Sequence, residues 1–231
     1  GGKAVNMGFL LRTIPDHSPT EAIAFSFDLW AGFMAQVLPN GITLKETIAL
    51  ELASTEFPVE DPSELSASLL GIRNMIKKDA QFSALQRRQI LQALISLDAK
   101  RRIRFRSSTN VEDSDQFSGA GLYDSFSGCL GDDIDADSEG PSDCDPTKEK
   151  ERGVFRAIQK VFASFYNENA FLERLRRGVE ENEVGMAILA HYSFPDEIEW
   201  ANGVGTLRVQ RGQDGLPKLI DGSLVTQKEA V

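Results

Sequence analysis

Helical spacing of apolar positions marks four stretches of the chain as helices. Asp61-Pro62-Ser63 carries the features of a helix start, and residues 61–78 then place Leu65, Leu69, Ile72 and Ile76 on one face. Ser83 with Gln86 three residues later resembles a capping box, and the helix that it opens is expected to end near Asp98. The same reasoning predicts helices over residues 149–166 and 169–177.

Other stretches have the patterns of strands. Ile103 and Phe105 alternate with Arg102, Arg104 and Arg106, which is the period of a half-buried strand. The continuous apolar run 184–194 predicts a buried strand, and residues 203–210 and 218–220 predict two short strands joined by a turn at 213–215. Residues 22–38 predict a short strand that leads into a helix. Strands and helices mix without regular βαβ alternation, so the expected fold class is α+β.

Composition places the chain among ordinary water-soluble globular proteins. It has 231 residues, 41% of them hydrophobic and 26% charged. A net charge of −10 argues against nucleic acid as a partner, because a polyanion is bound by clustered basic side chains. No apolar run approaches the roughly 20 residues of a membrane span. The first residues do not resemble a secretory signal, so a cytoplasmic location is expected. Cys129 and Cys144 are expected to be reduced thiols, and a disulfide between them is the alternative.

The acidic segment 131–147 is the least core-like part of the chain. It holds seven acids, and we expect a mobile surface loop because so many carboxylates cannot be buried without partners. Alternating acids in this segment also suggest a calcium loop, but Ser138 stands where such a loop requires glycine and Cys144 where it requires glutamate. A solvated loop is therefore the favoured interpretation.

The segment 104–126 carries the most informative chemistry. A strand with Arg106 at its end is followed by Ser107, Ser108 and Thr109, which read as a turn, and then by acids and glycines. A fixed guanidinium grips two phosphate oxygens, hydroxyls donate hydrogen bonds, and glycines let backbone N–H groups approach an anion. Spacing alone leaves a phosphate site and a plain strand–turn–hairpin about equally supported.

Three stretches resemble one known family. RSSTNVEDSDQFSGAGLYDS is similar to the arginine–serine–serine signature of the ATP-binding domain shared by phosphoenolpyruvate synthases and pyruvate phosphate dikinases. GGKAVNMGFLL is similar to the start of that domain, and VGMAILAHYSF with ANGVGTL resembles its later strand and hinge. This PEP/pyruvate-binding domain is a relative of ATP-grasp proteins. The resemblance therefore implies an ATP-grasp-like fold, with ATP and Mg²⁺ as cofactors.

The resemblance also implies roles for single residues. Arg106 matches the arginine that grips the ATP phosphates and is the expected catalytic residue; a surface strand arginine is the alternative. Lys3 matches a phosphate-contacting lysine, against a solvated terminal lysine, and backbone groups around His191 are expected to meet adenine. Ser107 and Ser108 match residues that donate hydrogen bonds to phosphate, or they are turn residues. Glu112 and Asp113 either orient Arg106 or cap a turn. Gly119 and Gly121 match a loop that covers the phosphates, or they form a simple hairpin turn.

Some features depart from the family pattern. We expect residues 1–180 to form the N-terminal ATP-grasp-like part and residues 181–231 to begin a second part that is incomplete at its C-terminal end. DEIEWA at 196–201 resembles a metal-binding motif but stands out of order, so the metal ligands stay unassigned. Neither His17 nor His191 lies in the context of a phosphate-carrying histidine.

The expected function follows from the resemblance. It is the ATP-binding domain of a dikinase-type phosphotransferase, which passes phosphate to a histidine on a separate domain and then to pyruvate or another acceptor. Because the second part is incomplete, the isolated chain is not expected to be fully active. The alternative is a degenerate module that binds a nucleotide or a partner without catalysis.

Overall fold

An antiparallel four-stranded sheet forms the centre of the structure, with strand order β1-β4-β2-β3. The computed structural model describes residues 2–13, 22–53, 55–111, 121–135, 137, 139–193, 203–211, 213 and 217–226. The strands of the sheet are β1 (Ala22–Phe25), β2 (Ile103–Thr109), β3 (Ser125–Gly128) and β4 (Met186–Tyr192). A separate two-stranded hairpin is formed by β5 (Gly203–Arg211) and β6 (Pro217–Thr226). The mixture of helices with antiparallel strands confirms the α+β class.

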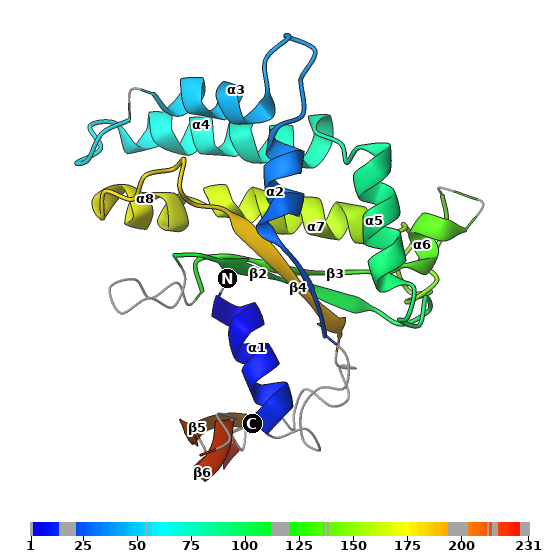
Figure 1. Cartoon of the computed structure of the whole chain (residues 1–231). Helices are drawn as coiled ribbons and strands as arrows, with labels where there is room; N and C mark the ends of the chain where they lie inside the picture. Colours follow the sequence, from blue (N-terminus) through cyan, green and yellow to red (C-terminus); the bar gives the residue numbers. More distant parts are fainter. Residues whose placement is uncertain are drawn as a thin grey trace.

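Most helices cover one face of the sheet, whereas the first helix and the β5–β6 hairpin lie on the other side (Figure 1). The helix α1 (Gly2–Thr13) contacts β2, β4 and β6. The helical layer contains α2 (Phe27–Met34), α3 (Leu44–Leu52), α4 (Pro62–Asn74), a π-helical extension (Met75–Asp79), α5 (Ala84–Leu94), α7 (Val154–Ala163), a 3₁₀ turn (Ser164–Tyr166) and α8 (Glu168–Arg176). A short helix, α6 (Gly131–Ile134), follows β3.

The core lies between the sheet and the helical layer. Ile103 and Phe105 of β2 point into it and are fully buried, while α7 buries most of its length. Aromatic rings from α2 and α7 meet there, with Trp30 and Phe162 in edge-to-face contact at 5.0 Å between centroids. Phe155 of α7 is also buried, and the Arg87 guanidinium lies 3.8 Å from its ring centre.

Several helix boundaries follow from local sequence. Asp61 caps α4, and both Ser83–Gln86 and Thr43–Glu46 form complete capping boxes. The helix after Ser83 ends at Leu94 rather than near Asp98, and it buries Ile90 and Leu94 while Ile95 beyond its end is 78% exposed. The helices α1 and α3 were not expected from the sequence pattern.

The acidic segment 131–147 is folded where the structure describes it, which contradicts the expected mobile loop. Asp132 is buried and accepts hydrogen bonds from the backbone N–H groups of Asp143 (2.8 Å) and Arg152 (2.6 Å). Cys129 and Cys144 form a disulfide, so the expectation of reduced thiols was wrong. Composition alone predicts that these carboxylates face solvent. In the structure, backbone N–H groups bind the Asp132 carboxylate and the disulfide fixes the segment.

Candidate functional site

The three hydroxyl residues after Arg106 form the end of a strand, not a turn. Ser107, Ser108 and Thr109 pair with Ile188, Ala187 and Met186 of β4, and all three are buried. Pairing with β4 carries the extended backbone three residues beyond the arginines. The hydroxyls therefore lie on a fixed backbone, where a turn would have left them exposed to solvent.

The start of α1 contacts this strand end. Lys3 Nζ donates to Ser107 Oγ over 3.5 Å, and the backbone N–H of Ala4 donates to Ser108 Oγ over 3.1 Å. The first turn of a helix has N–H groups without intrahelical partners, and Ser108 satisfies one of them from another element. The structure thus brings together Lys3, Ser107 and Ser108, which the sequence had singled out in two distant stretches.

Arg106 is exposed on the sheet face that α1 also covers. Residues of even number on β2 share this face, and Arg104 lies directly opposite His191 of β4. Arg106 itself lies opposite Leu189 on one side and Ser125 on the other. An exposed guanidinium two residues before the contact between α1 and Ser108 is well placed for an anion bound there.

His191 is buried on the same face. Burial lowers the pKa of its imidazole, the hydrogen bond to the Tyr192 carbonyl opposes this shift, and the nearby positive charges of Arg106 and Arg104 lower the pKa further. Its Nδ1 lies 2.8 Å from the Tyr192 carbonyl oxygen, which only accepts, so Nδ1 is the donor. Burial and the two arginines thus favour the neutral form of the imidazole.

Only part of the predicted glycine segment can be placed. Gly121 has a φ of +79°, a backbone conformation that favours glycine, and no neighbouring atom lies within 4 Å of where its Cβ would be. Glu112, Asp113 and Gly119 lie outside the described residues, as do His17 and the acids of the 196–201 motif.

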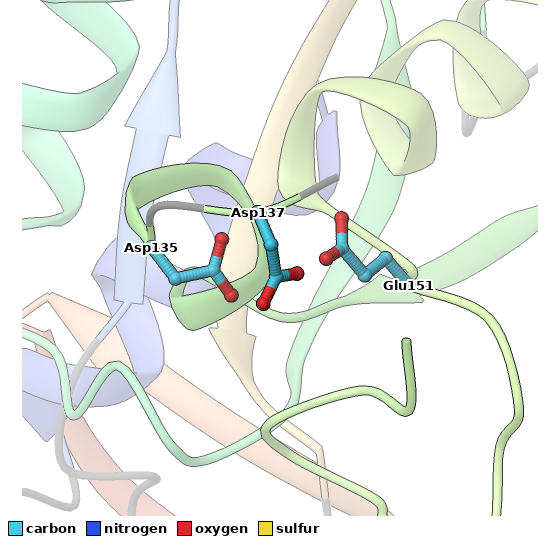
Figure 2. A group of neighbouring side chains, drawn as sticks. All are labelled: Asp135, Asp137 and Glu151. Atoms are coloured by element: carbon cyan, nitrogen blue, oxygen red, sulfur yellow. The ribbon is translucent and has the colours of Figure 1, made fainter. Parts of the chain in front are cut away.

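An acidic cluster that the sequence pattern did not predict lies beyond the far end of β3. The carboxylates of Asp135, Asp137 and Glu151 lie within 4.8 Å of one another and point toward a common space (Figure 2). The pKa of Glu151 is raised to about 7 by a side-chain hydrogen bond with Asp137, by desolvation and by the negative charges of neighbouring aspartates. Two acids of the rejected calcium pattern meet here, but the third, Glu151, comes from outside that pattern.

Asp133 has a different role from its neighbours. Its carboxylate accepts hydrogen bonds from the backbone N–H groups of Val154 and Phe155, at the first turn of α7. Burial raises its pKa to about 6, against the opposing effect of these two hydrogen bonds. It thus caps α7 from a distance of 21 residues in the chain, a contact that no local capping pattern reveals.

The acidic cluster and the contact between Lys3 and Ser107 lie toward opposite ends of β2. Gly128, which precedes α6, pairs with Ile103 at the start of β2, whereas α1 begins beside Ser107 and Ser108 near its end. At about 3.3 Å per residue, the described strand is roughly 20 Å long. The acidic cluster is therefore not part of the arrangement around Lys3.

Comparison with known proteins decides the family. The sequence profile of the family described as "Pyruvate phosphate dikinase, AMP/ATP-binding domain" matches residues 1–204. The chain belongs to this family. Its members are AMP/ATP-binding domains of dikinase-type phosphotransferases, which confirms the resemblance seen in the sequence. A search of curated protein sequences gave no match.

The family match covers the four-stranded sheet, its helical layer and the first residues of β5. Both the start of α1 and the arginine–serine strand fall within it, and these are the two segments that the structure brings together. Among the described helices, none combines the length and apolar character needed to cross a bilayer.

Proposed function

We propose that the chain binds the phosphates of ATP at the C-terminal end of β2, beside the first turn of α1. The observation that carries the proposal is the contact of Lys3 Nζ with Ser107 Oγ, which places an ammonium group at the strand residue that directly follows Arg106. An ATP-binding family and a fixed group of cations and hydroxyls support the same ligand.

The residues around this point fit a triphosphate. In this proposal Lys3 contributes a compact positive charge and Arg106 a planar fork that grips two oxygens. Arg106 neutralises negative charge on the phosphoryl group as it is transferred, which is the role proposed for it as the catalytic residue. Ser107 and Ser108 keep the first turn of α1 against the strand, so that the ammonium and the guanidinium share one ligand.

The proposed fold is ATP-grasp-like. The sheet β1-β4-β2-β3 with its helices is the proposed N-terminal part, and the β5–β6 hairpin begins the second. Since β4 is hydrogen-bonded between β1 and β2, we place the division between the two parts after Tyr192 instead of at residue 180. Adenine is proposed to lie beside the side chain of His191, since the backbone groups of Ala190 and His191 are already paired with β1 and β2. The segment with Glu112, Asp113, Gly119 and Gly121 is proposed to cover the phosphates.

Magnesium accompanies ATP in this proposal because it prefers phosphate and carboxylate oxygens as ligands. The cluster of Asp135, Asp137 and Glu151 does not fit a metal that bridges the phosphates, since it lies toward the opposite end of β2. No step is therefore assigned to the metal. The phosphoryl group is proposed to pass to a histidine of a separate domain and then to pyruvate or another acceptor.

The test is the affinity of the 231-residue chain for ATP with Mg²⁺, measured by calorimetry on Arg106→Ala, Arg106→Lys and Lys3→Ala. Loss of a charge-assisted hydrogen bond is worth about 1.5–3 kcal/mol, so each alanine variant should bind at least tenfold more weakly. Arg106→Lys should not restore binding, because an ammonium cannot form the fork.

The control is Arg88→Ala, an exposed arginine on α5. Circular dichroism shows whether each variant is folded. Unchanged affinity in Arg106→Ala would contradict the proposal, and so would an equal loss in Arg88→Ala. Binding without transfer to the histidine domain of the whole enzyme would instead favour a non-catalytic nucleotide-binding module.

A further inference from the structure

A second group of cations lines a pocket along the outer side of β3, away from the contact between Lys3 and Ser107. The pocket has a volume of about 340 Å³. Five of its lining residues are basic: Arg102 and Arg104 come from the start of β2, and the other three come from α7 and the residue before its N-cap (Arg152, Arg156, Lys160).

The three cations of the α7 segment stand four residues apart. This spacing places Arg156 and Lys160 one turn from each other on the same side of the helix. Lys160 is half-buried, with its Nζ 4.2 Å from the centre of the Phe126 ring. Its pKa is lowered by burial and then by the positive charges of Arg156, Lys77 and Arg152. The cations therefore repel one another in the free protein.

Several described carboxylates lie near these cations: Asp124 raises the pKa of Lys160, and Asp132 accepts a hydrogen bond from the Arg152 amide. Arg102 faces Asp145 at 3.9 Å, and Arg104 donates to Ser127 Oγ at 3.5 Å. Neither Arg152 nor Arg156 forms an ion pair with any residue that the structure describes, and both are exposed. The amide groups at the start of α7 are already bound by the Asp133 carboxylate, so an anion in the pocket would be bound by side chains.

A solvated basic surface is the simplest alternative interpretation. It does not account for the concave shape, nor for five like charges drawn together from two elements that are neighbours only in the fold. Like charges on adjacent turns destabilise a helix, so such a group is unfavourable unless an anion joins it. Guanidinium groups bind phosphate oxygens in pairs, and the volume is within the range of small-molecule sites.

We propose that this pocket is a second anion site, which binds a small phosphorylated compound of about the size of pyrophosphate. Arg156 reaches the ligand from α7, Arg152 from the residue before its N-cap and Arg104 from β2, and the Ser127 hydroxyl lies among them. The cations of this pocket are distinct from Lys3 and Arg106, which lie toward the other end of β2, although Arg104 stands opposite His191 at the adenine end of the proposed ATP site.

The test is calorimetric titration of the 231-residue chain with inorganic pyrophosphate. Arg152→Ala and Arg156→Ala should each weaken binding by about tenfold, since each removes a charge-assisted contact. Affinity should also fall as the salt concentration rises, because the contacts are exposed to solvent. The matched control is Arg88→Ala, which should bind as the unchanged chain does. An unchanged affinity in Arg156→Ala would overturn the proposal.

Pyrophosphate also resembles the phosphates of ATP, so the two sites must be told apart. In NMR spectra of the ¹⁵N-labelled chain, pyrophosphate should shift the amide signals of Ser127, Gly153 and Ala157, and it should do so in Arg106→Ala as well. Arg156→Ala should keep its affinity for ATP. Shifts confined to Ala4 and Ser108 would overturn the second site and leave the proposed ATP site standing. If the chain did not bind ATP while pyrophosphate still shifted the Ser127 signal, the proposed ATP site would be overturned and the second site would stand.

Discussion

The ammonium group of Lys3 donates to Ser107 Oγ across 3.5 Å, although 104 residues separate the two in the chain. One turn of α1 is thereby held against the end of β2, together with the bond from the Ala4 amide to Ser108. The position of the lysine thus depends on a strand that lies far away in the sequence, and the strength of this attachment can be measured.

Ser108→Ala should loosen α1. The variant removes the acceptor of the Ala4 amide from a site where Ser108 has no exposed surface, and a net loss of about 1 kcal/mol is expected. For a chain of this size the melting temperature should fall by roughly 2–4 °C. Ser68→Ala, which removes a solvent-accessible hydrogen bond from α4 to Glu51 Oε1, is the control and should change little. Equal melting temperatures for the two variants would show that the contact does not hold α1.

Glu151→Gln should change how stability depends on pH. The pKa of Glu151 is raised to about 7 in the folded chain and is near 4.5 when unfolded. Between these values the folded state holds more protons, so Glu151 makes the free energy of unfolding fall as pH rises from about 4.5 to 7.

Replacement by glutamine removes that contribution. The variant should therefore gain stability relative to the unchanged chain as pH rises through this window, and the difference should level off above it. Chemical denaturation of both proteins at several pH values measures it. A difference that is constant with pH would show that the carboxylates do not repel one another in the folded chain.

Gly153→Ala should destabilise the start of α7. A Cβ at this position would overlap the carboxylate of Asp133, which would have to release the amides of Val154 and Phe155. Loss of a helix cap costs about 1 kcal/mol, and thermal denaturation should show it. The control is Gly71→Ala on α4, which should increase the free energy of unfolding. A Cβ at this position meets no atom within 4 Å, so the variant should be stabilised by about 0.5–1 kcal/mol. Stabilisation by both variants would mean that Asp133 moves without cost.

Arg174→Ala should be the most damaging of these changes. The guanidinium is fully buried and donates to Glu181 Oε1 (2.6 Å) and to the carbonyl oxygens of Phe165 (2.9 Å) and Ala170 (3.2 Å). Because the Glu181 side chain is 36% exposed, the expected cost comes from the buried carbonyl groups left without a donor, about 1–3 kcal/mol for each. Arg176→Ala, at an exposed ion pair with Glu173, should cost at most about 1 kcal/mol. Similar midpoints for the two variants in urea would contradict this interpretation.

Reduction of the disulfide should lower stability. The bond between Cys129 and Cys144 closes a loop over a sequence separation of 15 residues, for which chain entropy predicts about 3 kcal/mol. Cys129→Ser with Cys144→Ser should melt at a lower temperature than the oxidised chain and should not respond to a reducing agent. A melting temperature equal to that of the oxidised chain would show that Asp132 and Asp133 alone hold the segment.

Local patterns in the sequence predicted much of the fold. The alternation at Ile103–Arg106 and the apolar run around Ala190 both proved to be strands, because the period of the pattern depends only on neighbouring residues. The folded structure of residues 131–147 was not predicted, because their carboxylates accept hydrogen bonds from backbone amides 11 to 22 residues away. Buried Arg174 was missed for the same reason, since its partners surround it only after folding.

The candidate site, too, could be predicted from the sequence only in part. Resemblance pointed to Lys3 and to the Arg106–Ser107–Ser108 stretch as separate motifs, and the structure adds that they touch. No local pattern indicated that Glu151 joins the acidic cluster, because the disulfide and the hydrogen bonds of Asp132 and Asp133 determine where its segment lies.

The position of β4 has a consequence for how the chain acquires its structure during synthesis. It is the last strand of the main sheet to leave the ribosome, yet it lies between β1 and β2. Until residues up to Tyr192 have left the ribosome, β1 has no partner strand in this sheet, and β2 is paired only with β3. The edge of β1 waits for the 160 residues between Phe25 and Met186, and the edge of β2 waits for the 76 residues between Thr109 and Met186. During these intervals the two edges are the surfaces that a chaperone would have to protect.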